Sequence, residues 1–202
     1  MSAPGTPVPE LVVLLDEDGR AVGTAPKAGV HHARTPLHLA FSCYLFDGAG
    51  RLLLTRRALH KPTWPGAWTN SVCGHPGPCE APADAVRRRV RDEVGVRAED
   101  VRLLLPGFRY RAVMDNGVVE NEMCPVFVAT TTDEPRPDPA EVADVAWTDW
   151  AAFRAGVLDG SEDVSPWCRE QVAGLPEHPL DSPARPDAEL PPAARHRGTP
   201  AQ

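Results

Sequence analysis

Residues 74–96 read GHPGPCEAPADAVRRRVRDEVGV, and the local structure of this stretch decides the fold. Its first half is dense in glycine and proline, which predicts an irregular loop. Its second half predicts a helix over Pro82–Val94, because proline favours the first turn of a helix and Gly95 follows the last. One face of this helix is apolar, since apolar residues recur there at helical spacing: Ala85, Val86, Val90 and Val94.

The same stretch resembles the Nudix box, G-x5-E-x7-R-E-U-x-E-E-x-G-U, in which U is a bulky apolar residue. The matching positions are Gly74, Glu80, Arg88, Val90, Glu93, Gly95 and Val96. Two positions depart from the pattern, because Arg89 and Asp92 stand where the box has glutamates. In Nudix hydrolases the helix carboxylates hold Mg²⁺ against a diphosphate, so a cation at position 89 removes part of that metal cluster. The resemblance implies a diphosphate-binding fold whose hydrolytic apparatus is altered.

The rest of the chain alternates short apolar runs with turn signals. The expected strands are Leu11–Leu15, His38–Phe46, Arg51–Arg56, Gly107–Val113, Val118–Thr131 and Val142–Thr148, with hairpin turns at Asp47–Gly50 and Asp115–Gly117. Residues 62–80 predict a long loop, and Trp150–Gly156 and Trp167–Ala173 predict short helices. Because strands and helices mix without strict alternation, we expect an α/β (α+β) fold, a Nudix-like mixed β-sheet sandwiched by helices in a single domain.

Composition limits the classes of function. The 202 residues carry a net charge of −7 and are 42% apolar, which is typical of one globular domain. The negative charge argues against binding to nucleic acid or to an anionic membrane surface. No run approaches the ~18–20 apolar residues of a membrane helix. The five cysteines show no paired framework, so we expect reduced thiols and a cytoplasmic protein.

Proline is concentrated at the two ends of the chain. Of the 23 prolines, three lie in residues 1–9 and seven in residues 175–202. The segment from Leu175 onward also lacks helical or alternating apolar periodicity, so it offers little surface to offset its ordering entropy. We therefore expect disordered tails at 1–9 and 175–202 around a folded domain of residues 10–174.

Five residues of the chain have side chains suited to a metal site. Glu120 and Glu122 are two apart in a predicted strand, so both point to one face, where two carboxylates need a cation or a shared proton. A solvated strand face is the alternative interpretation of this pair. His31, His38 and His75 lie in or beside loops, and with the carboxylates they would make an N/O site for Zn, Mn or Fe. Spacing alone does not show that the five converge.

Several motifs resemble type I isopentenyl-diphosphate isomerases. They are Leu37–Ser42 (LHLAFS), Thr55–Ala58 (TRRA), Trp64–Gly66 (WPG), Trp68–Pro76 (WTNSVCGHP), Phe108–Ala112 (FRYRA), Val119–Glu122 (VENE) and Cys124–Phe127 (CPVF). The resemblance covers roughly residues 11–170 in one register, and the TNSVCGHP run is highly specific. It implies interconversion of isopentenyl diphosphate and dimethylallyl diphosphate. Such an enzyme protonates an alkene on one face, removes a proton on the other, and keeps water from a carbocation-like intermediate.

The resemblance also implies roles for individual residues. Cys73 and Glu122 match the acid–base pair on opposite sides of the substrate, in an order that stays open. Tyr110 would hydrogen-bond to Glu122, and Trp167 would face the developing cation. A tightly bound Mn²⁺ or Zn²⁺ would lie on His31, His38, His75, Glu120 and Glu122. Mg²⁺ would join the diphosphate to Glu93 and the Cys73 carbonyl, beside a basic lining of Lys27, Arg57, Lys61 and Arg89.

Two alternatives to the isomerase remain at this stage, a Nudix hydrolase of a nucleoside diphosphate derivative and a non-catalytic, metal-dependent diphosphate-binding protein. Arg89 in place of a box carboxylate disfavours the hydrolase, and the presence of every expected catalytic residue disfavours the binding protein. His32 competes with His31 as a ligand, and we select His31 because its seven-residue step to His38 matches the family spacing. We expect a small-molecule substrate, isopentenyl diphosphate, and a monomer or weak dimer.

Overall fold

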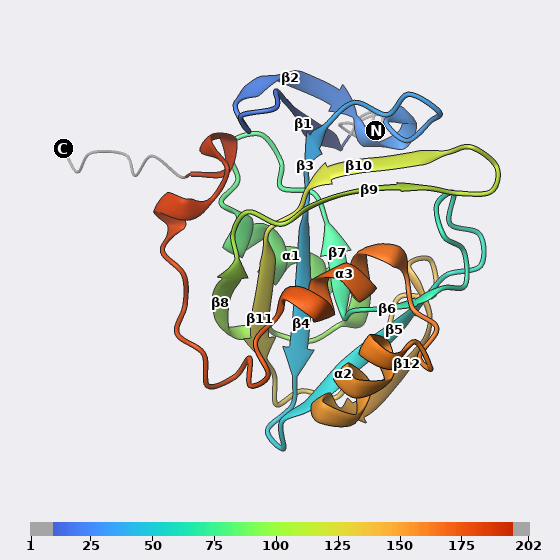
Figure 1. Ribbon diagram of the computed structural model, residues 1–202, viewed down its shortest axis with the longest axis vertical. Helices are drawn as coiled ribbons and strands as arrows, with labels where there is room; N and C mark the ends of the chain where they lie inside the picture. The colour runs from blue at the N-terminus through green and yellow to red at the C-terminus, as the bar shows by residue number, and fades with distance from the viewer. Residues whose placement is uncertain (1–9, 196–202) are drawn as a thin grey trace, which may run out of the picture.

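The computed structural model describes residues 10–195, which fold around two β-sheets (Figure 1). The predicted N-terminal tail, residues 1–9, lies outside the described residues. The smaller sheet has five strands, β2 (Ala21–Pro26), β1 (Leu11–Leu15), β3 (His38–Leu39), β10 (Val119–Met123) and β9 (Arg109–Val113). The larger sheet has seven, β12 (Val142–Asp149), β5 (Arg51–Arg57), β4 (Phe41–Phe46), β11 (Val126–Thr130) and β8 (Glu99–Leu105), with β6 (Trp68–Thr69) beside β5 and β7 (Val72–Gly74) beside β4. The expected α+β class is confirmed, with two mixed sheets instead of one.

Strand β4 is the centre of the larger sheet and is buried on both faces. Its alternate side chains enter two separate cores, since successive residues of a strand point to opposite faces. Phe41, Cys43 and Leu45 pack with the apolar face of α1 (Pro82–Val94), whereas Tyr44 and Phe46 pack with α2 and α3. The larger sheet is thus covered by α1 on one face and by α2 (Trp150–Asp159) and α3 (Pro166–Gly174) on the other (Figure 1).

Helix α1 has the bounds predicted from its sequence. Gly95 ends it in the left-handed region at φ 70°, and a Cβ atom there would lie 2.6 Å from the carbonyl oxygen of Arg136. Glycine is therefore required at this position both by the backbone conformation and by the close approach of the next loop. Within residues 10–195 no helix combines the length and the hydropathy that crossing a bilayer requires.

The predicted strand over Val118–Thr131 is wrong in one respect, because it divides at Cys124 and Pro125 into β10 and β11. Proline has no N–H for the sheet ladder, and the chain passes there from the smaller sheet to the larger. Strand β3 continues into β4 in the same way, and β10 pairs parallel with β3 as β11 does with β4. The loop predicted at 62–80 also contains the short strands β6 and β7.

The expectation of disorder from residue 175 onward differs from the structure for residues 175–195. Leu190 and Ala194 are buried in the core that α1 covers, and two short 3-10 turns (Asp187–Glu189 and Pro192–Ala194) lead to them. Backbone hydrogen bonds from Arg185 to Leu103 and from Ala193 to Gly19 fix the segment. The physical reason is that a few buried apolar residues and main-chain hydrogen bonds are enough to order a segment when it packs against a surface that is already folded. Residues 196–202 lie outside the described range.

Candidate active site

A cavity of about 380 Å³ lies between the two sheets. The larger sheet contributes Cys73 from β7 and Arg57 from β5, and the smaller contributes Glu122 from β10. The further lining residues are Glu10, Pro26, Lys27, Ala28, His31, Lys61, Pro62, Thr63, Gly74, His75, Arg89, Tyr110, Glu120, Glu141 and Trp167. Most of the residues singled out in the sequence therefore face one space.

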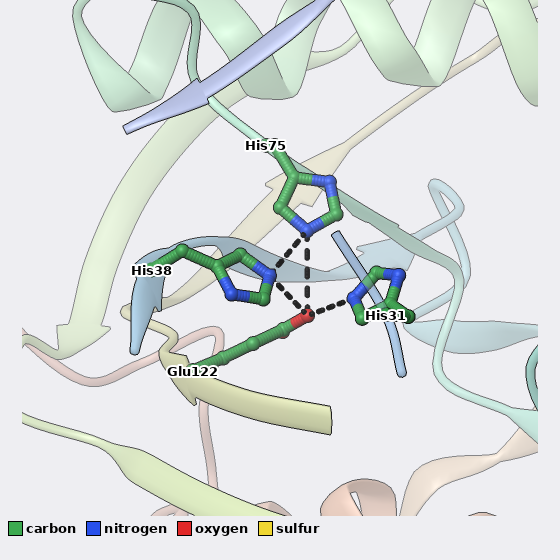
Figure 2. Close-up of side chains that lie close together, drawn as sticks. All are labelled: His31, His38, His75 and Glu122. Carbon is green, nitrogen blue, oxygen red and sulfur yellow. Dashed lines mark hydrogen bonds and ion pairs between the residues drawn. The ribbon is translucent and has the colours of Figure 1, made fainter. Parts of the chain in front are cut away.

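Three imidazoles converge on one carboxylate oxygen at this cavity (Figure 2). The Nε2 atoms of His38 and His75 each lie 3.3 Å from Glu122 Oε1, and His31 Nε2 lies 3.5 Å from it. One ligand atom from each residue lies within 4.8 Å of all the others. We call His31, His38, His75 and Glu122 the histidine cluster.

Strand pairing brings the histidine cluster together. Strands β3 and β10 are parallel, with Glu122 directly opposite His38. The parallel pairing of β3 with β10 therefore places the side chains of His38 and Glu122 next to each other, although the two residues are 84 positions apart in the sequence. His75 follows the end of β7, and His31 follows the short 3-10 turn at Lys27–Gly29.

Ring nitrogens and a carboxylate oxygen lie close together in this cluster. His38 Nδ1 donates to the carbonyl oxygen of Pro36 at 2.9 Å, which leaves Nε2 directed at the cluster. Burial lowers the pKa of His38, but the hydrogen bond and the charge of Glu122 outweigh burial and raise it. His38 Nε2 faces His75 Nε2 at 3.2 Å, and burial lowers the pKa of His75 to about 4. His31 Nε2 is buried without a hydrogen-bond partner. This donor set suits a divalent transition metal, which accepts imidazole and carboxylate ligands together.

Glu120 and Tyr110 form the edge of the cluster. The Tyr110 hydroxyl lies 2.7 Å from Glu120 Oε2 and 3.0 Å from Glu122 Oε2, and its single proton can satisfy only one of them at a time. Burial and the charge of Glu122 raise the pKa of Glu120. Burial would also raise the pKa of Glu122, but the three imidazoles lower it well below its usual range. Glu120 lines the cavity but does not belong to the histidine cluster. His32, which follows His31 in the sequence, is exposed and does not line the cavity.

Cys73 lies partly exposed to the cavity. Burial raises the pKa of its thiol to about 11, despite the hydrogen bond with Ser42, which lowers it. The group is therefore a thiol at neutral pH and carries a proton that it can donate. Cys73 lies on β7 of the larger sheet, whereas Glu122 lies on β10 of the smaller sheet.

A second charged group lies at α1 and the loop before β12. Arg89 donates to Glu93 Oε1 from Nε at 2.9 Å and lies 3.3 Å from Glu141 Oε1, while Lys61 pairs with Glu141 Oε2. We call Lys61, Arg89, Glu93 and Glu141 the arginine cluster. Glu93 is buried beneath Arg89 and does not line the main cavity. Burial raises the pKa of Glu93, although Arg89 opposes that shift.

The other predicted substrate contacts also face the cavity. Lys27 pairs with Glu10 at 2.9 Å. Arg57 donates twice to the carbonyl oxygen of Thr63, and its guanidinium carbon lies 5.5 Å from the ring centre of Trp167. Trp167 is almost completely buried and stands 5.8 Å from Tyr110 between ring centres, which makes the inner part of the cavity aromatic.

Several residues of the site were missed by sequence reasoning. Glu10 and Glu141 are counter-charges of predicted substrate residues. Ser42 and Asn70 contact the Cys73 thiol, and Gln171 donates to Ser42. Glu141 had no signal of its own, because it stands in an acidic, proline-rich loop. Ser42 and Asn70 lie within motifs that we quoted, but their types alone do not indicate a role.

Comparison with known proteins places this arrangement in a family. The NUDIX domain model matches residues 36–168. The chain is 59% identical to the isopentenyl-diphosphate Delta-isomerase of Saccharopolyspora erythraea over 92% of this chain and 97% of that protein. It is 62% identical to the isopentenyl-diphosphate Delta-isomerase of Mycolicibacterium vanbaalenii over 84% of this chain and 93% of that protein.

Solved structures agree on the fold. A Deinococcus radiodurans protein superposes with a TM-score of 0.62 at 19% identity, covering 82% of this chain and 98% of its own. A MutT protein from Methanosarcina mazei gives 0.53 at 18% identity, covering 69% of this chain and 92% of its own. From the family model and the sequence relatives, the chain belongs to the NUDIX domain family and, within it, to the isopentenyl-diphosphate Delta-isomerases.

Proposed function

We propose that this isomerase interconverts isopentenyl diphosphate and dimethylallyl diphosphate, with Cys73 and Glu122 as its acid–base pair. One observation carries the assignment: a thiol and a buried carboxylate, held on different sheets, line the same cavity. A substrate between them has one proton-transfer group on each side. Each direction of the reaction needs one of these groups protonated and the other free, and the reverse reaction exchanges their states.

The chemistry explains why such a cavity is needed. An alkene is a very weak base, so its protonation requires a donor in a site from which water is excluded. The donor's proton forms a new C–H bond with the alkene electron pair, which leaves a positive charge on the tertiary carbon. The second group then removes a proton from the neighbouring carbon, and that C–H pair becomes the new double bond.

Trp167 and Tyr110 stabilise this intermediate in the proposed reaction. Both rings are buried and line the cavity, so water is displaced from around the cationic carbon. The face of a tryptophan ring attracts a desolvated cation by ~2 kcal/mol, which corresponds to roughly thirtyfold in rate. The same apolar surface keeps water from adding to the cation.

The residues present also fit the metals that the family requires. His31, His38, His75 and Glu122, with Glu120 beside them, would hold Mn²⁺ or Zn²⁺, and Glu93 with the Cys73 carbonyl would hold Mg²⁺. A bound divalent cation supplies positive charge that lowers the proton affinity of a carboxylate ligand. Lys27, Arg57, Lys61 and Arg89 bind the diphosphate, and the paired N–H groups of the two arginines suit its oxygens.

The arginine cluster favours the isomerase over a hydrolase. Arg89 stands where a hydrolase has a metal-binding box glutamate, and it donates to Glu93, the one box carboxylate that is left for Mg²⁺ in the proposed site. A fixed positive charge here binds the diphosphate without activating water against it. The five cysteines of the described chain are all free, which fits a reducing compartment, and we expect a cytoplasmic monomer or weak dimer without nucleic-acid or membrane partners.

One experiment separates the candidate functions. Purified protein is incubated with isopentenyl diphosphate and Mg²⁺ in D₂O, and the products are followed by NMR. Dimethylallyl diphosphate that carries deuterium supports the proposal. Release of phosphate or pyrophosphate would show a hydrolase, and unchanged substrate would show a binding protein.

A further inference from the structure

Behind the Cys73 thiol lies a group of polar side chains that the chemistry above does not use. Ser42, Asn70 and Gln171 are fully buried, and none of them lines the cavity. Ser42 Oγ lies 3.4 Å from Cys73 Sγ, and Asn70 Oδ1 lies 3.2 Å from it. We infer that Ser42, held by Gln171, is a positioning residue that donates a hydrogen bond to the Cys73 sulfur while the thiol proton moves to and from the substrate.

The orientation of Asn70 is fixed by its own hydrogen bonds. Its Nδ2 donates to the carbonyl oxygens of Cys43 and Val72 at 3.1 and 2.9 Å, so Oδ1 must point the other way. There it accepts from Trp167 Nε1 at 3.1 Å and from the Cys73 thiol. An amide oxygen has no proton to give, so Asn70 orients the S–H bond but cannot donate to the sulfur.

The orientation of Ser42 follows from the groups around its hydroxyl. The Tyr44 hydroxyl donates to Gln171 Oε1 at 3.1 Å, which directs Gln171 Nε2 at Ser42 Oγ, 2.9 Å away. Ser42 Oγ also lies 3.4 Å from Cys124 Sγ, a pair in which either group can donate, and Gln171 Nε2 lies 3.9 Å from the same sulfur. In the inferred arrangement the Cys124 thiol donates to Ser42 Oγ. With its lone pairs filled by Gln171 and Cys124, the Ser42 hydroxyl directs its own proton at Cys73.

This arrangement places a donor where charge develops, and the inference rests on the proposed function, in which Cys73 exchanges a proton with substrate carbon. As the S–H bond breaks and the C–H bond forms, the S–H electron pair stays on sulfur, and the Ser42 hydroxyl already faces it. Hydrogen bonds to a developing anion are stronger than those to a neutral group. Because Ser42 is directly opposite Cys73 in the β4–β7 pairing, strand register fixes the contact before substrate arrives.

The test is Ser42→Ala, with Ser71→Ala as the matched control. Ser71 is equally buried and its hydroxyl makes two hydrogen bonds, from Leu45 N at 2.7 Å and to Leu53 O at 2.6 Å, but none to Cys73. We expect Ser42→Ala to lower kcat about tenfold with KM within twofold. Ser71→Ala should lower the melting temperature at least as much and leave kcat within twofold.

A second variant tests the role of Gln171. If Gln171 acts through Ser42, Gln171→Met lowers kcat, and the double variant with Ser42→Ala is no slower than Ser42→Ala alone. Multiplying effects would overturn that part of the inference. A normal kcat in Ser42→Ala, or an equal kcat loss in Ser71→Ala, would overturn the whole of it. Cys73→Ala in the same assay separates the two levels: if it is inactive while Ser42→Ala is normal, only the inference fails, and if it turns over normally, the proposed function fails as well.

Discussion

The histidine cluster and the arginine cluster lie at the same cavity but differ in their balance of charges. In the arginine cluster, two cations and two carboxylates pair directly, so their formal charges cancel. In the histidine cluster, four potential metal-ligand atoms lie within 4.8 Å of one another, and no lysine or arginine belongs to the group. The first cluster is complete as a set of side chains, whereas the second has the ligand atoms for a divalent cation.

The difference suits the two clusters to two separate tasks, binding the diphosphate and binding a metal. A buried ion pair that is already satisfied preserves its geometry until a stronger anion, the diphosphate, competes for its cations. The imidazoles of the histidine cluster lie 3.2–3.5 Å from one another or from Glu122 and are suited to binding one cation together, so we expect bound metal to stabilise their geometry. The comparison therefore predicts that the geometry of the histidine cluster depends on a bound metal, whereas the side chains of the arginine cluster are already paired before Mg²⁺ and the diphosphate bind.

The strongest test removes the reacting groups themselves. Cys73→Ala and Glu122→Gln should each lower kcat by ~10³-fold or more, because each deletes one of the two proposed proton-transfer groups. The NMR assay for dimethylallyl diphosphate measures the loss, and circular dichroism checks that the fold persists. As control, Glu17→Gln removes an exposed carboxylate away from the cavity and should leave kcat unchanged. Near-normal turnover in either active-site variant would refute the acid–base assignment.

Metal content tests the difference between the clusters directly. His38→Ala should weaken metal binding by ~10²-fold, since it removes a buried nitrogen from the group, whereas His32→Ala, beside the cluster but exposed, should not. Elemental analysis after dialysis, with melting temperatures before and after chelation, gives both readouts. A chelator should lower the melting temperature of the wild type and of His32→Ala but have little further effect on His38→Ala. Equal metal content in the two variants would show that the histidine cluster is not the site.

A smaller effect is expected at the rim. Lys61→Gln should raise KM for isopentenyl diphosphate about tenfold, or ~1.4 kcal/mol, with kcat within twofold, because it removes one of the charges proposed to bind the diphosphate. Arg56→Gln, on the strand that precedes Lys61 but outside the cavity lining, is the control and should change neither constant. The KM effect should shrink as salt rises, since Lys61 is partly exposed and salt screens such charges. A fall in kcat without a change in KM would show that Lys61 acts on the proton-transfer steps and not on binding of the diphosphate.

The sequence predicted those parts of the fold that local patterns determine. Helix α1 has local signals at both ends, a proline in its first turn and Gly95 after its last, and its bounds were correct. The division between β10 and β11 was missed because the residues on both sides have the same apolar character, although Pro125 marked the place. Strand β2 was missed because its residues are mostly exposed and show no alternating pattern.

The site was predictable by a different route. Periodicity could not bring His38 and Glu122 together, because their contact depends on a parallel pairing between distant strands; family motifs supplied it instead. Glu141 and Gln171 were beyond both routes. Glu141 contacts Arg89 and Gln171 contacts Ser42, two residues that lie in the quoted motifs, but the positions of Glu141 and Gln171 depend only on tertiary packing.

The C-terminal segment offers the smallest expected effect on turnover. Leu190 is 2% exposed in the core that α1 covers, so Leu190→Ala should lower the free energy of unfolding by about 2–5 kcal/mol. Neither cluster contacts this residue, so kcat and KM at 25 °C should stay within twofold. Leu158→Ala, at a position 50% exposed, is the matched control and should cost no more than ~0.5 kcal/mol in urea denaturation. If the two variants were equally stable, residues 175–195 would not be packed in solution, and the expectation of a disordered tail would hold. If Leu190→Ala instead lost turnover while folded, the two clusters would depend on this segment. The difference between the clusters could then no longer be attributed to their own residues.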